Sequence, residues 1–353
     1  MSNVAVSERE AVGLQPACAP VAPGAGILGA VGNTPLVRLA QLFGEESFAG
    51  YAKLEGMNPA GSSKDRPALK MVMRAAETGR INNATTVIES SSGNLGIGLA
   101  QVCTYLGLRL ICVVDPNITE QNLRILRAYG AEVEMVTQPS PQGDFLSARV
   151  ARVKEMLRAI PNSFWCNQYA NTHNPEAHHD TAREILRDLG AAPDFIFCAT
   201  SSCGTLRGCA EFIRARGLPT RVVAVDAQGS VIFGQRPAKR LIPGHGAARR
   251  PELYRAGLED LHFNISDFEA VAGCRWLLRT EAIFAGGSSG AVVSAALKLA
   301  PAIPRDSVCV LIFSDRGERY LSTVYSDEWV LENFGELPEM PARRRPDQAA
   351  AAK

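Results

Sequence analysis

The chain has 353 residues, of which 46% are apolar, so it is long enough for one large or two medium domains with buried cores. Lysine and arginine number 37 against 36 acidic residues, and this balance gives no electrostatic reason to expect nucleic acid or an anionic membrane as a partner. The nine cysteines show no CxxC pair or framework spacing, which predicts reduced thiols in a cytoplasmic protein. Prolines interrupt residues 14–31, so we expect neither a signal peptide nor a membrane span.

Residues 1–25 and 338–353 are rich in Ala, Pro and charge without a helical or strand period, which predicts two flexible tails. Between them, short β-branched runs alternate with amphipathic stretches. TVIES at 86–90, for example, precedes NLGIGLAQVCTYLG at 94–107, and DFIFCAT at 194–200 precedes a helix predicted from about Gly204 to Arg216. This alternation predicts an α/β fold with two mostly parallel sheets, each covered by helices on both faces.

In such folds ligands bind beyond the carboxyl ends of the strands. The first segment of interest is NPAGSSKDR at 58–66, which follows the apparent strand YAKLE at 51–55 and places Lys64 at the start of a helix. An ammonium is unfavourable at the positive end of a helix dipole, so position and burial both favour the neutral amine that imine formation requires. Taken alone, this segment fits an ordinary lysine in a solvated loop equally well.

Three further strand-to-helix turns are rich in small residues. SSSGN at 90–94 offers backbone N–H groups to a carboxylate, and Asn94 offers an amide to a ring hydroxyl, although a plain capped turn explains the segment too. SSCGT at 201–205 is suited to a dianionic phosphate, yet it is neither GxGxxG nor a P-loop. GGSSG at 286–290 brings a hydroxyl near a heterocycle nitrogen, or simply forms a tight helix-packing turn.

Taken together and in this order, the four motifs resemble those of fold-type II pyridoxal-5′-phosphate (PLP) enzymes of the cysteine synthase and cystathionine β-synthase group. The resemblance runs from GNTPLVRL at 32–39 to GERYLS at 317–322. It implies PLP as cofactor and a tryptophan synthase β-like pair of three-layer αβα domains. Residues 26–57 and 165–337 would form the large PLP-binding domain, and residues 58–164 a smaller, mobile substrate domain. A homodimer is also expected from the resemblance.

The same resemblance implies a role for each site residue. Lys64 would carry the cofactor as a Schiff base and move the Cα proton, while Asn94 would bind the phenolic oxygen. Ser288 would face the pyridine nitrogen, where a neutral hydroxyl suits β-elimination better than transamination. The phosphate would lie on Ser201, Ser202, Cys203, Gly204 and Thr205, and the substrate on Ser91, Ser92, Gln168, Tyr169 and Ser201.

The sequence departs from typical cysteine synthases at the second-substrate side. Those enzymes usually carry Gly-Thr-Gly-Gly-Thr in the phosphate loop and Phe after the carboxylate-binding Gln, whereas this chain has Ser201 to Cys203 and Tyr169. LEGMNP at 54–59 and VDAQGSVIFG at 225–234 look most like the 2,3-diaminopropionate-forming synthases of siderophore pathways. That resemblance implies O-phospho-L-serine and L-glutamate as substrates, and N-(2-amino-2-carboxyethyl)-L-glutamate and phosphate as products.

Two anionic substrates require cationic partners. Arg249 is the first candidate and Arg66 a weaker one, and a surface arginine is the alternative for both. His173, His178 and His179 suggest a metal site only superficially, because no converging Cys or carboxylate set accompanies them; we favour a role at a helix start.

Three other functions remain open from the sequence. The first is a cysteine synthase that uses O-acetylserine or O-phosphoserine with sulfide, and the second is a cystathionine β-synthase-like enzyme that uses homocysteine. The third is a non-catalytic binding protein, which the joint presence of Lys64, Asn94 and Ser288 disfavours.

Overall fold

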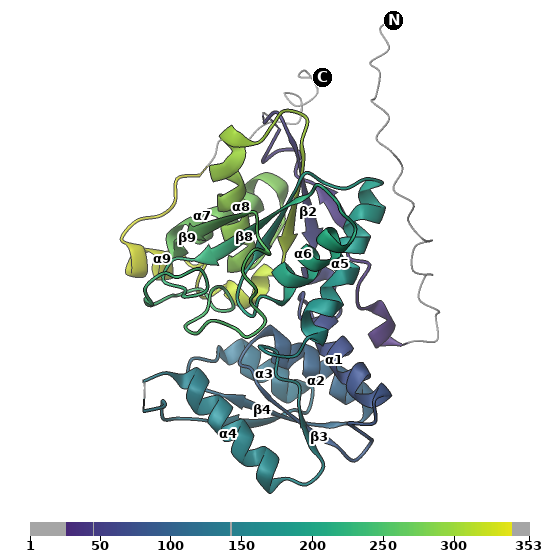
Figure 1. Cartoon of the computed structure of the whole chain (residues 1–353). Coiled ribbons are helices and arrows are strands. Elements are labelled where there is room, and N and C mark those ends of the chain that lie inside the picture. Colours follow the sequence, from purple (N-terminus) through teal and green to yellow (C-terminus); the bar gives the residue numbers. More distant parts are fainter. Residues whose placement is uncertain (1–25, 45, 142, 341–353) are drawn as a thin grey trace, which may run out of the picture.

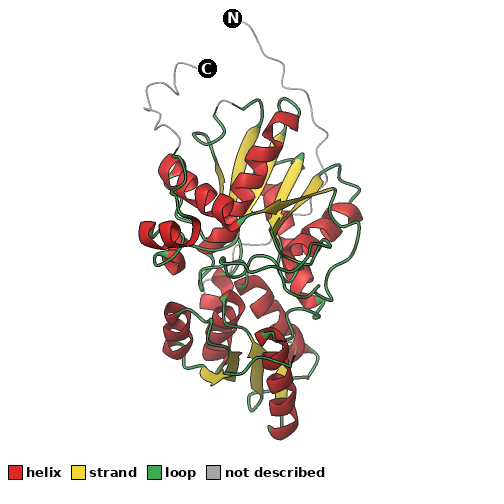
Figure 2. Ribbon diagram, turned by 90° about the vertical axis from the view of Figure 1, so that its left-hand side faces the viewer, coloured by secondary structure: helices red, strands yellow, loops and turns green. Residues whose placement is uncertain are grey.

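The computed structural model describes residues 26–44, 46–141 and 143–340. The predicted tail 1–25 and residues 341–353 of the second tail lie outside the described residues. The described chain forms two stacked bodies, each with its own sheet and helices (Figures 1 and 2). No helix among these residues is long and apolar enough to cross a bilayer.

The larger body contains a six-stranded sheet in the order β1-β2-β10-β7-β8-β9. All neighbouring strands are parallel except β1, which is antiparallel to β2 at the sheet edge. The strands are β1 (Leu36–Arg38), β2 (Ala49–Leu54), β7 (Phe195–Ala199), β8 (Arg221–Ala227), β9 (Leu261–Ile265) and β10 (Val308–Phe313). The helices of this body are α5 (His173–Leu189), α6 (Gly204–Ala215), α7 (Asp267–Glu281), α8 (Gly287–Leu299) and α9 (Asp327–Phe334).

Both faces of this sheet are buried, as the near-continuous apolar strands require. Successive side chains of a strand point to opposite faces. Accordingly Phe195 and Phe197 of β7 pack with α7 and α8, whereas Ile196 and Cys198 pack with α5 and α6. The helices therefore cover the sheet in two layers, and their N-termini follow the carboxyl ends of the strands.

The smaller body contains a four-stranded, all-parallel sheet in the order β5-β4-β3-β6. Its strands are β3 (Thr86–Ser90), β4 (Arg109–Val114), β5 (Glu132–Met135) and β6 (Ser163–Trp165). Its helices are α1 (Asp65–Glu77), α2 (Asn94–Leu106), α3 (Glu120–Ala128) and α4 (Phe145–Ala159). Val87 packs on the α1 and α2 side and Ile88 on the α4 side. Four short 3₁₀ helices complete the described chain, namely η2 (Ile27–Ala30), η3 (Glu55–Met57), η4 (Ala300–Ala302) and η5 (Gly317–Tyr320).

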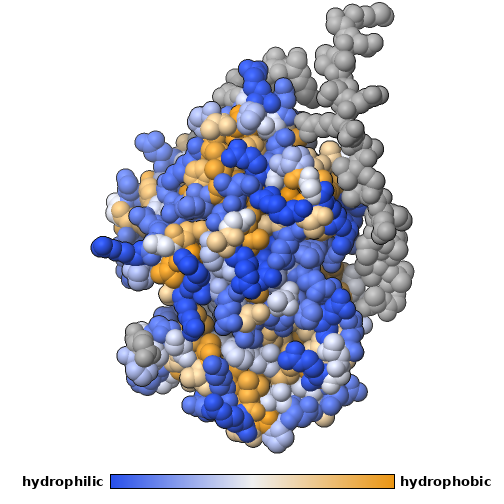
Figure 3. Space-filling view, viewed as in Figure 1, coloured by the Kyte–Doolittle hydropathy of each residue, from blue (hydrophilic) through white to orange (hydrophobic). Residues whose placement is uncertain are grey.

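The predicted α/β class with two helix-covered sheets is confirmed. The four predicted turns are also present, because Lys64, Gly93, Cys203 and Gly286 each cap the N-terminus of a helix. The division into domains at residues 57, 58, 164 and 165 stays a proposal. The face shown in Figure 3 is mostly hydrophilic with scattered apolar residues, as is usual for a folded chain.

Candidate active site

The lysine turn is attached to the end of the large sheet. Lys64 is the N-cap residue of α1. The backbone N–H of Ser63 donates to the carbonyl of Ser314 at 2.7 Å, and Ser62 pairs with Asp315 in an isolated antiparallel bridge. Because Ser314 and Asp315 directly follow β10, the lysine lies at the carboxyl edge where ligands bind in parallel sheets.

The amine of Lys64 is held in a crowded, charged environment. Its Nζ atom donates to the Ser63 hydroxyl at 3.1 Å, and its side chain is only partly exposed. Burial lowers the pKa of Lys64, while the nearby carboxylates of Asp315, Glu55 and Asp65 act in the opposite direction. A lysine with a lowered pKa reaches its neutral, nucleophilic form more readily.

Asp315 joins three of the predicted motifs. Its Oδ2 atom accepts from the Asn94 amide at 2.8 Å and from the Tyr320 hydroxyl at 2.7 Å, while its backbone carbonyl accepts from Gly286 N–H at 3.2 Å. The side-chain carbonyl of Asn94 also accepts from Arg319. Oδ1 of Asp315 is buried and has no hydrogen-bond partner among the described residues, and a Cβ on Gly286 would lie 2.0 Å from it. The buried Ser288, in the first turn of α8, is thus brought to the same place as Lys64.

The turn at 201–205 connects β7 to α6. Cys203 is its N-cap residue and has a left-handed backbone with φ 66° and ψ 8°. The Cys203 side chain packs with Ile232 and Ala247, and burial raises the pKa of its thiol to about 12. Only the backbone of Cys203 is therefore available to a ligand, together with the hydroxyls and amides of its neighbours in the turn.

Asn174 of α5 packs directly beneath this turn. Its Nδ2 atom donates to the carbonyl of Gln168 at 2.7 Å and to the hydroxyl of Ser202 at 3.4 Å. A Cβ placed on Gly204 would come within 2.1 Å of Asn174 Oδ1. The close approach of α5 to α6 therefore requires glycine at position 204.

His178 connects the turn to the lysine. Its Nε2 atom lies 3.3 Å from Thr205 Oγ1, and its Nδ1 atom lies 3.2 Å from Thr181 Oγ1. Burial, followed by the charge of Lys64, lowers the pKa of His178 to about 3, so the imidazole is neutral. Both motifs therefore act on one buried histidine, Lys64 through its charge and Thr205 through a 3.3 Å contact.

The predicted substrate residues lie in two adjacent loops. The hydroxyl of Ser91 accepts from Gly96 N–H at 3.0 Å, and that of Ser92 accepts from Arg149 at 2.9 Å. Gln168 is buried and Tyr169 partly exposed in the second loop. Burial raises the pKa of Tyr169, and the charges of Arg149 and Arg240 oppose that shift. Arg149 thus acts on both loops, through a hydrogen bond to Ser92 and through its charge at Tyr169.

The carboxyl group of Glu89 accepts hydrogen bonds from residues at both loops. Its Oε1 atom accepts from Ser90 N–H at 2.9 Å and from Trp165 Nε1 at 3.1 Å, and the backbone amides of Asn167 and Gln168 also face the carboxyl group. The side chain is only 1% exposed. Burial raises its pKa to about 7, with these hydrogen bonds working in the opposite direction. This carboxyl therefore titrates near neutral pH.

Comparison with known proteins agrees with this geometry. The model of the family described as "Pyridoxal-phosphate dependent enzyme" matches residues 27–315. The chain belongs to this family. PLP is accordingly its cofactor, and the fold is that of fold-type II PLP enzymes.

Curated relatives cover most of the chain. It is 48% identical over 306 residues to the N-(2-amino-2-carboxyethyl)-L-glutamate synthase of Ralstonia nicotianae, covering 86% of this chain and 90% of the relative. It is 47% identical to the synthase of the same name from Cupriavidus metallidurans, covering 92% and 94%. The solved structure of the O-acetylserine dependent cystathionine β-synthase from Helicobacter pylori has a TM-score of 0.79 and 33% identity, covering 85% and 98%.

The residues present fit PLP. The N-terminus of α6 supplies amides and hydroxyls for a phosphate, with Gly204 leaving room for close approach. Lys64 supplies an amine with a lowered pKa, and one buried carboxylate oxygen of Asp315, at the turn that precedes Ser288, has no partner in the part of the chain that the structure describes. These residues offer the kinds of contact that a ligand with a phosphate at one end and an aldehyde at the other requires.

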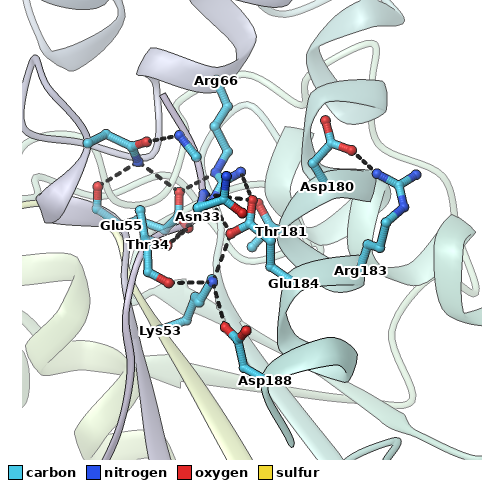
Figure 4. A network of polar contacts seen from close by, with 12 residues as sticks. Asn33, Thr34, Lys53, Glu55, Arg66, Asp180, Thr181, Arg183, Glu184 and Asp188 are labelled. Atoms are coloured by element: carbon cyan, nitrogen blue, oxygen red, sulfur yellow. Dashed lines mark hydrogen bonds and ion pairs between the residues drawn. The ribbon is translucent and has the colours of Figure 1, made fainter. Parts of the chain in front are cut away.

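Arg66 is neither an anion ligand nor a surface arginine, the two roles that the sequence suggests. It is 5% exposed, so it is not a surface arginine. Its guanidinium donates to Glu55 and to Glu184 in two bidentate pairs, with distances of 2.6 to 2.8 Å (Figure 4). The prediction of Arg66 as an anion ligand is wrong, because two buried carboxylates already occupy its donors.

Arg249 is exposed and remains a candidate anion ligand. Its charge acts on Asp144, the N-cap residue of α4. Although partial burial works the other way, hydrogen bonds from Ser147 and Ser140 and the charge of Arg249 hold the pKa of Asp144 below its usual range.

The three histidines serve different purposes. His173 is the first residue of α5, so the predicted helix start is confirmed, and its Nδ1 atom lies 2.7 Å from Glu176. His179 lies 3.8 Å from Glu211. Within the described ranges no group of three or more His, Cys, Asp or Glu residues is arranged to hold a metal ion.

Proposed function

We propose that this chain joins O-phospho-L-serine and L-glutamate into N-(2-amino-2-carboxyethyl)-L-glutamate by PLP-dependent β-replacement, with release of phosphate. The names and the 47–48% identity of the two curated relatives support this reaction. The structural observation that carries it is the position of Arg149, whose Nη1 atom donates to the Ser92 hydroxyl at 2.9 Å in the loop proposed to bind the substrate. Sulfide requires no such charge, whereas a dicarboxylate does.

Each proposed residue has a distinct task. When bound, PLP supplies an electron sink that makes removal of the Cα proton possible. Lys64 Nζ would hold the cofactor and carry that proton, and its lowered pKa keeps the neutral amine accessible. The amides and hydroxyls of 201–205 would bind the phosphate of the cofactor, with His178 orienting Thr205. Asn94 would bind the phenolic oxygen, and Ser288 would face the ring nitrogen.

The substrate would lie on the two loops that Glu89 connects. Ser91, Ser92 and Gln168 would bind the α-carboxylate of the first substrate. Arg149 contributes a positive charge beside Ser92, because it donates to the Ser92 hydroxyl at 2.9 Å, and it is held in place by an ion pair with Asp115 at 3.0 Å. A carboxylate that arrives beside Tyr169 would meet a positive charge that is already fixed in position.

A second candidate is an enzyme that uses homocysteine or sulfide as the nucleophile. The Helicobacter pylori structure favours it, since that neighbour is 33% identical and is described as a cystathionine β-synthase. The two readings share the first half-reaction and differ only in the compound that attacks Cβ.

The cellular setting is also part of the proposal. The product would feed 2,3-diaminopropionate and siderophore biosynthesis in the cytoplasm. The enzyme would work as a homodimer, with residues 58–164 as a substrate domain that closes over residues 26–57 and 165–337. Arg249, whose charge acts on Asp144, would then contribute to binding one of the two anions.

A competition assay tests this function. Purified holoenzyme receives O-phospho-L-serine together with L-glutamate, sulfide and homocysteine, and the products are identified by mass. We expect phosphate release to depend on glutamate and the glutamate adduct to dominate. Rapid turnover with sulfide and none with glutamate would replace the proposal with a cysteine synthase, and a thioether product would replace it with the second candidate.

Two variants refine the assay. Lys64→Ala is expected to abolish turnover with every nucleophile. Arg149→Gln should raise KM for glutamate at least tenfold, because one charge-assisted hydrogen bond contributes about 1.5–3 kcal/mol. An unchanged KM for glutamate in Arg149→Gln would exclude this guanidinium from the second-substrate site.

A further inference from the structure

Five charged side chains form a largely buried network between β2, α1 and α5 (Figure 4). Arg66 lies at its centre, with Nε 2.6 Å and Nη2 2.8 Å from the Glu55 carboxylate, and Nη1 and Nη2 each 2.7 Å from Glu184. Lys53 Nζ lies 2.8 Å from Glu184 and 3.5 Å from Asp188. Lys53 and Glu55 are completely buried. Bidentate pairs of this kind fix both the distance and the orientation of their partners.

Stability alone explains such a network poorly. Removing charges from water costs several kcal/mol per ion, and buried ion pairs often contribute no more than well-packed apolar side chains would. What the network supplies is geometry. It connects the first turn of α1 to α5, and Arg66 follows Lys64 by two residues.

The same helix α5 also contacts the turn at 201–205. Asn174 donates to the Ser202 hydroxyl at 3.4 Å, and His178 Nε2 lies 3.3 Å from Thr205 Oγ1. From Asn174 to Glu184 the helix rises about 15 Å, at 1.5 Å per residue. One rigid element therefore touches the lysine turn at one point and the 201–205 turn at another.

A rigid cofactor makes this separation important. PLP carries its aldehyde and its phosphate on a planar ring, so both ends are engaged at once only if Lys64 and the phosphate-binding turn are correctly spaced. Two linked contacts reinforce each other only when the geometry permits simultaneous engagement.

We propose that α5 is a spacer between the two ends of the cofactor site, and that Glu184 and Arg66 are positioning residues that set the distance from Lys64 to the 201–205 turn. This inference rests on the cofactor contacts proposed above for Lys64 and residues 201–205. It does not depend on which nucleophile the enzyme uses.

Glu184 is the cleanest position at which to test the spacer. Glu55 and Asp315 act on the charge of Lys64, whereas Glu184 is not among the groups that shift the pKa of that lysine. Glu184→Gln keeps the shape of the side chain and weakens its bidentate hydrogen bonds with Arg66. A change in cofactor binding would therefore report geometry and not the charge of the lysine.

The experiment compares PLP with pyridoxal, which lacks the phosphate. Apoenzyme is titrated with each compound, and the absorbance of the bound form gives two dissociation constants. The dissociation constant for pyridoxal divided by that for PLP measures how much the phosphate contributes to affinity once the aldehyde end is bound. In Glu184→Gln we expect this ratio to fall at least tenfold, while the dissociation constant for pyridoxal changes less than twofold.

Two matched variants serve as controls. Asp188→Asn removes a carboxylate one turn further along α5 that pairs with Lys53 and not with Arg66. Glu281→Gln weakens two backbone contacts, to Gln41 and Leu42, which follow β1 and lie toward the amino end of β2, away from Lys53. Both should keep the ratio of the unmodified enzyme even where their melting temperatures fall.

Several outcomes would overturn the spacer. An unchanged ratio in Glu184→Gln, with only a lower melting temperature, would reduce the network to a structural role. An equal loss of affinity for PLP and pyridoxal would place its effect on the lysine turn alone. If Glu184→Gln yields no folded apoenzyme, Arg66→Lys decides, since it keeps the charge and loses the bidentate geometry. Lys64→Ala is measured in parallel, and pyridoxal binding like that of the unmodified enzyme would refute the lysine assignment itself.

Discussion

Gly204→Ala offers a direct test of how α5 supports the 201–205 turn. The added Cβ would lie 2.1 Å from Asn174 Oδ1 and 2.7 Å from its Cγ atom. Both are far inside van der Waals contact, so the Asn174 amide has to move. Its Nδ2 atom would then give up the hydrogen bonds to the Gln168 carbonyl and the Ser202 hydroxyl.

The magnitude follows from two costs. Overpacking of a dense interior costs about 1–3 kcal/mol. A buried carbonyl left without a donor, here that of Gln168, costs about 1–3 kcal/mol more. We therefore expect Gly204→Ala to lower the free energy of unfolding of the apoprotein by about 2–6 kcal/mol, and to weaken PLP binding at least tenfold.

A double-mutant cycle separates the clash from other effects. Asn174→Ala removes the obstructing amide and by itself should cost about 2–3 kcal/mol. Once that amide is gone, Gly204→Ala should add less than about 1 kcal/mol in urea denaturation. If the two losses of free energy are simply additive, a clash with the Asn174 amide does not cause the destabilisation of Gly204→Ala, and the explanation is refuted.

Three other predictions concern titration and backbone strain. Although burial raises the pKa of Glu55, Arg66 and Thr34 hold it at about 2. The free energy of unfolding of the apoprotein should therefore fall by about 3 kcal/mol as pH falls from about 4.5 to 2. Glu55→Gln should lack this part of the acid-denaturation curve. Glu89 has the opposite sign, because its raised pKa of about 7 favours the protonated folded form; stability should fall by about 3 kcal/mol between pH 4.5 and 7, and a Glu89→Gln variant whose urea midpoint falls just as steeply would contradict this. Cys203 has a left-handed backbone with φ 66°. The free energy of unfolding of Cys203→Gly should therefore stay within about 1 kcal/mol of that of the unmodified protein, while Cys203→Val should lower it by more than about 2 kcal/mol. Equal melting temperatures for the two variants would show that the left-handed backbone carries no strain.

The sequence predicted those features that depend on neighbouring residues. Alternating β-branched and amphipathic stretches are local, so both sheets and the helices that begin near Lys64, Asn94, Gly204 and Gly287 were found. Small residues at strand ends identified the turns that meet in the site. The antiparallel edge strand β1 was not predicted, because three residues carry too little periodicity to assign a direction.

The residues that were misjudged or missed depend on distant partners. The sequence suggests Arg66 as an anion ligand because it does not reveal a carboxylate that Arg66 binds. That carboxylate belongs to Glu184, 118 residues away in the chain. His178 was regarded only as part of a helix start, although the turn that it supports contains Thr205, 27 residues further on. Arg149 had no motif around it, and its hydrogen bond to Ser92 spans 57 residues. Such contacts arise from packing, which a single sequence does not display.

The pairing of β2 with β10 has a consequence for biosynthesis. Ala49 to Leu54 lie beside Val308 to Phe313, and the turn that carries Lys64 is held by Ser314. A nascent chain therefore exposes the lysine long before its support emerges from the ribosome, whereas β3 to β6 lie close together in sequence and can assemble early. A translation product that ends before β10 therefore lacks the backbone contacts that position Lys64.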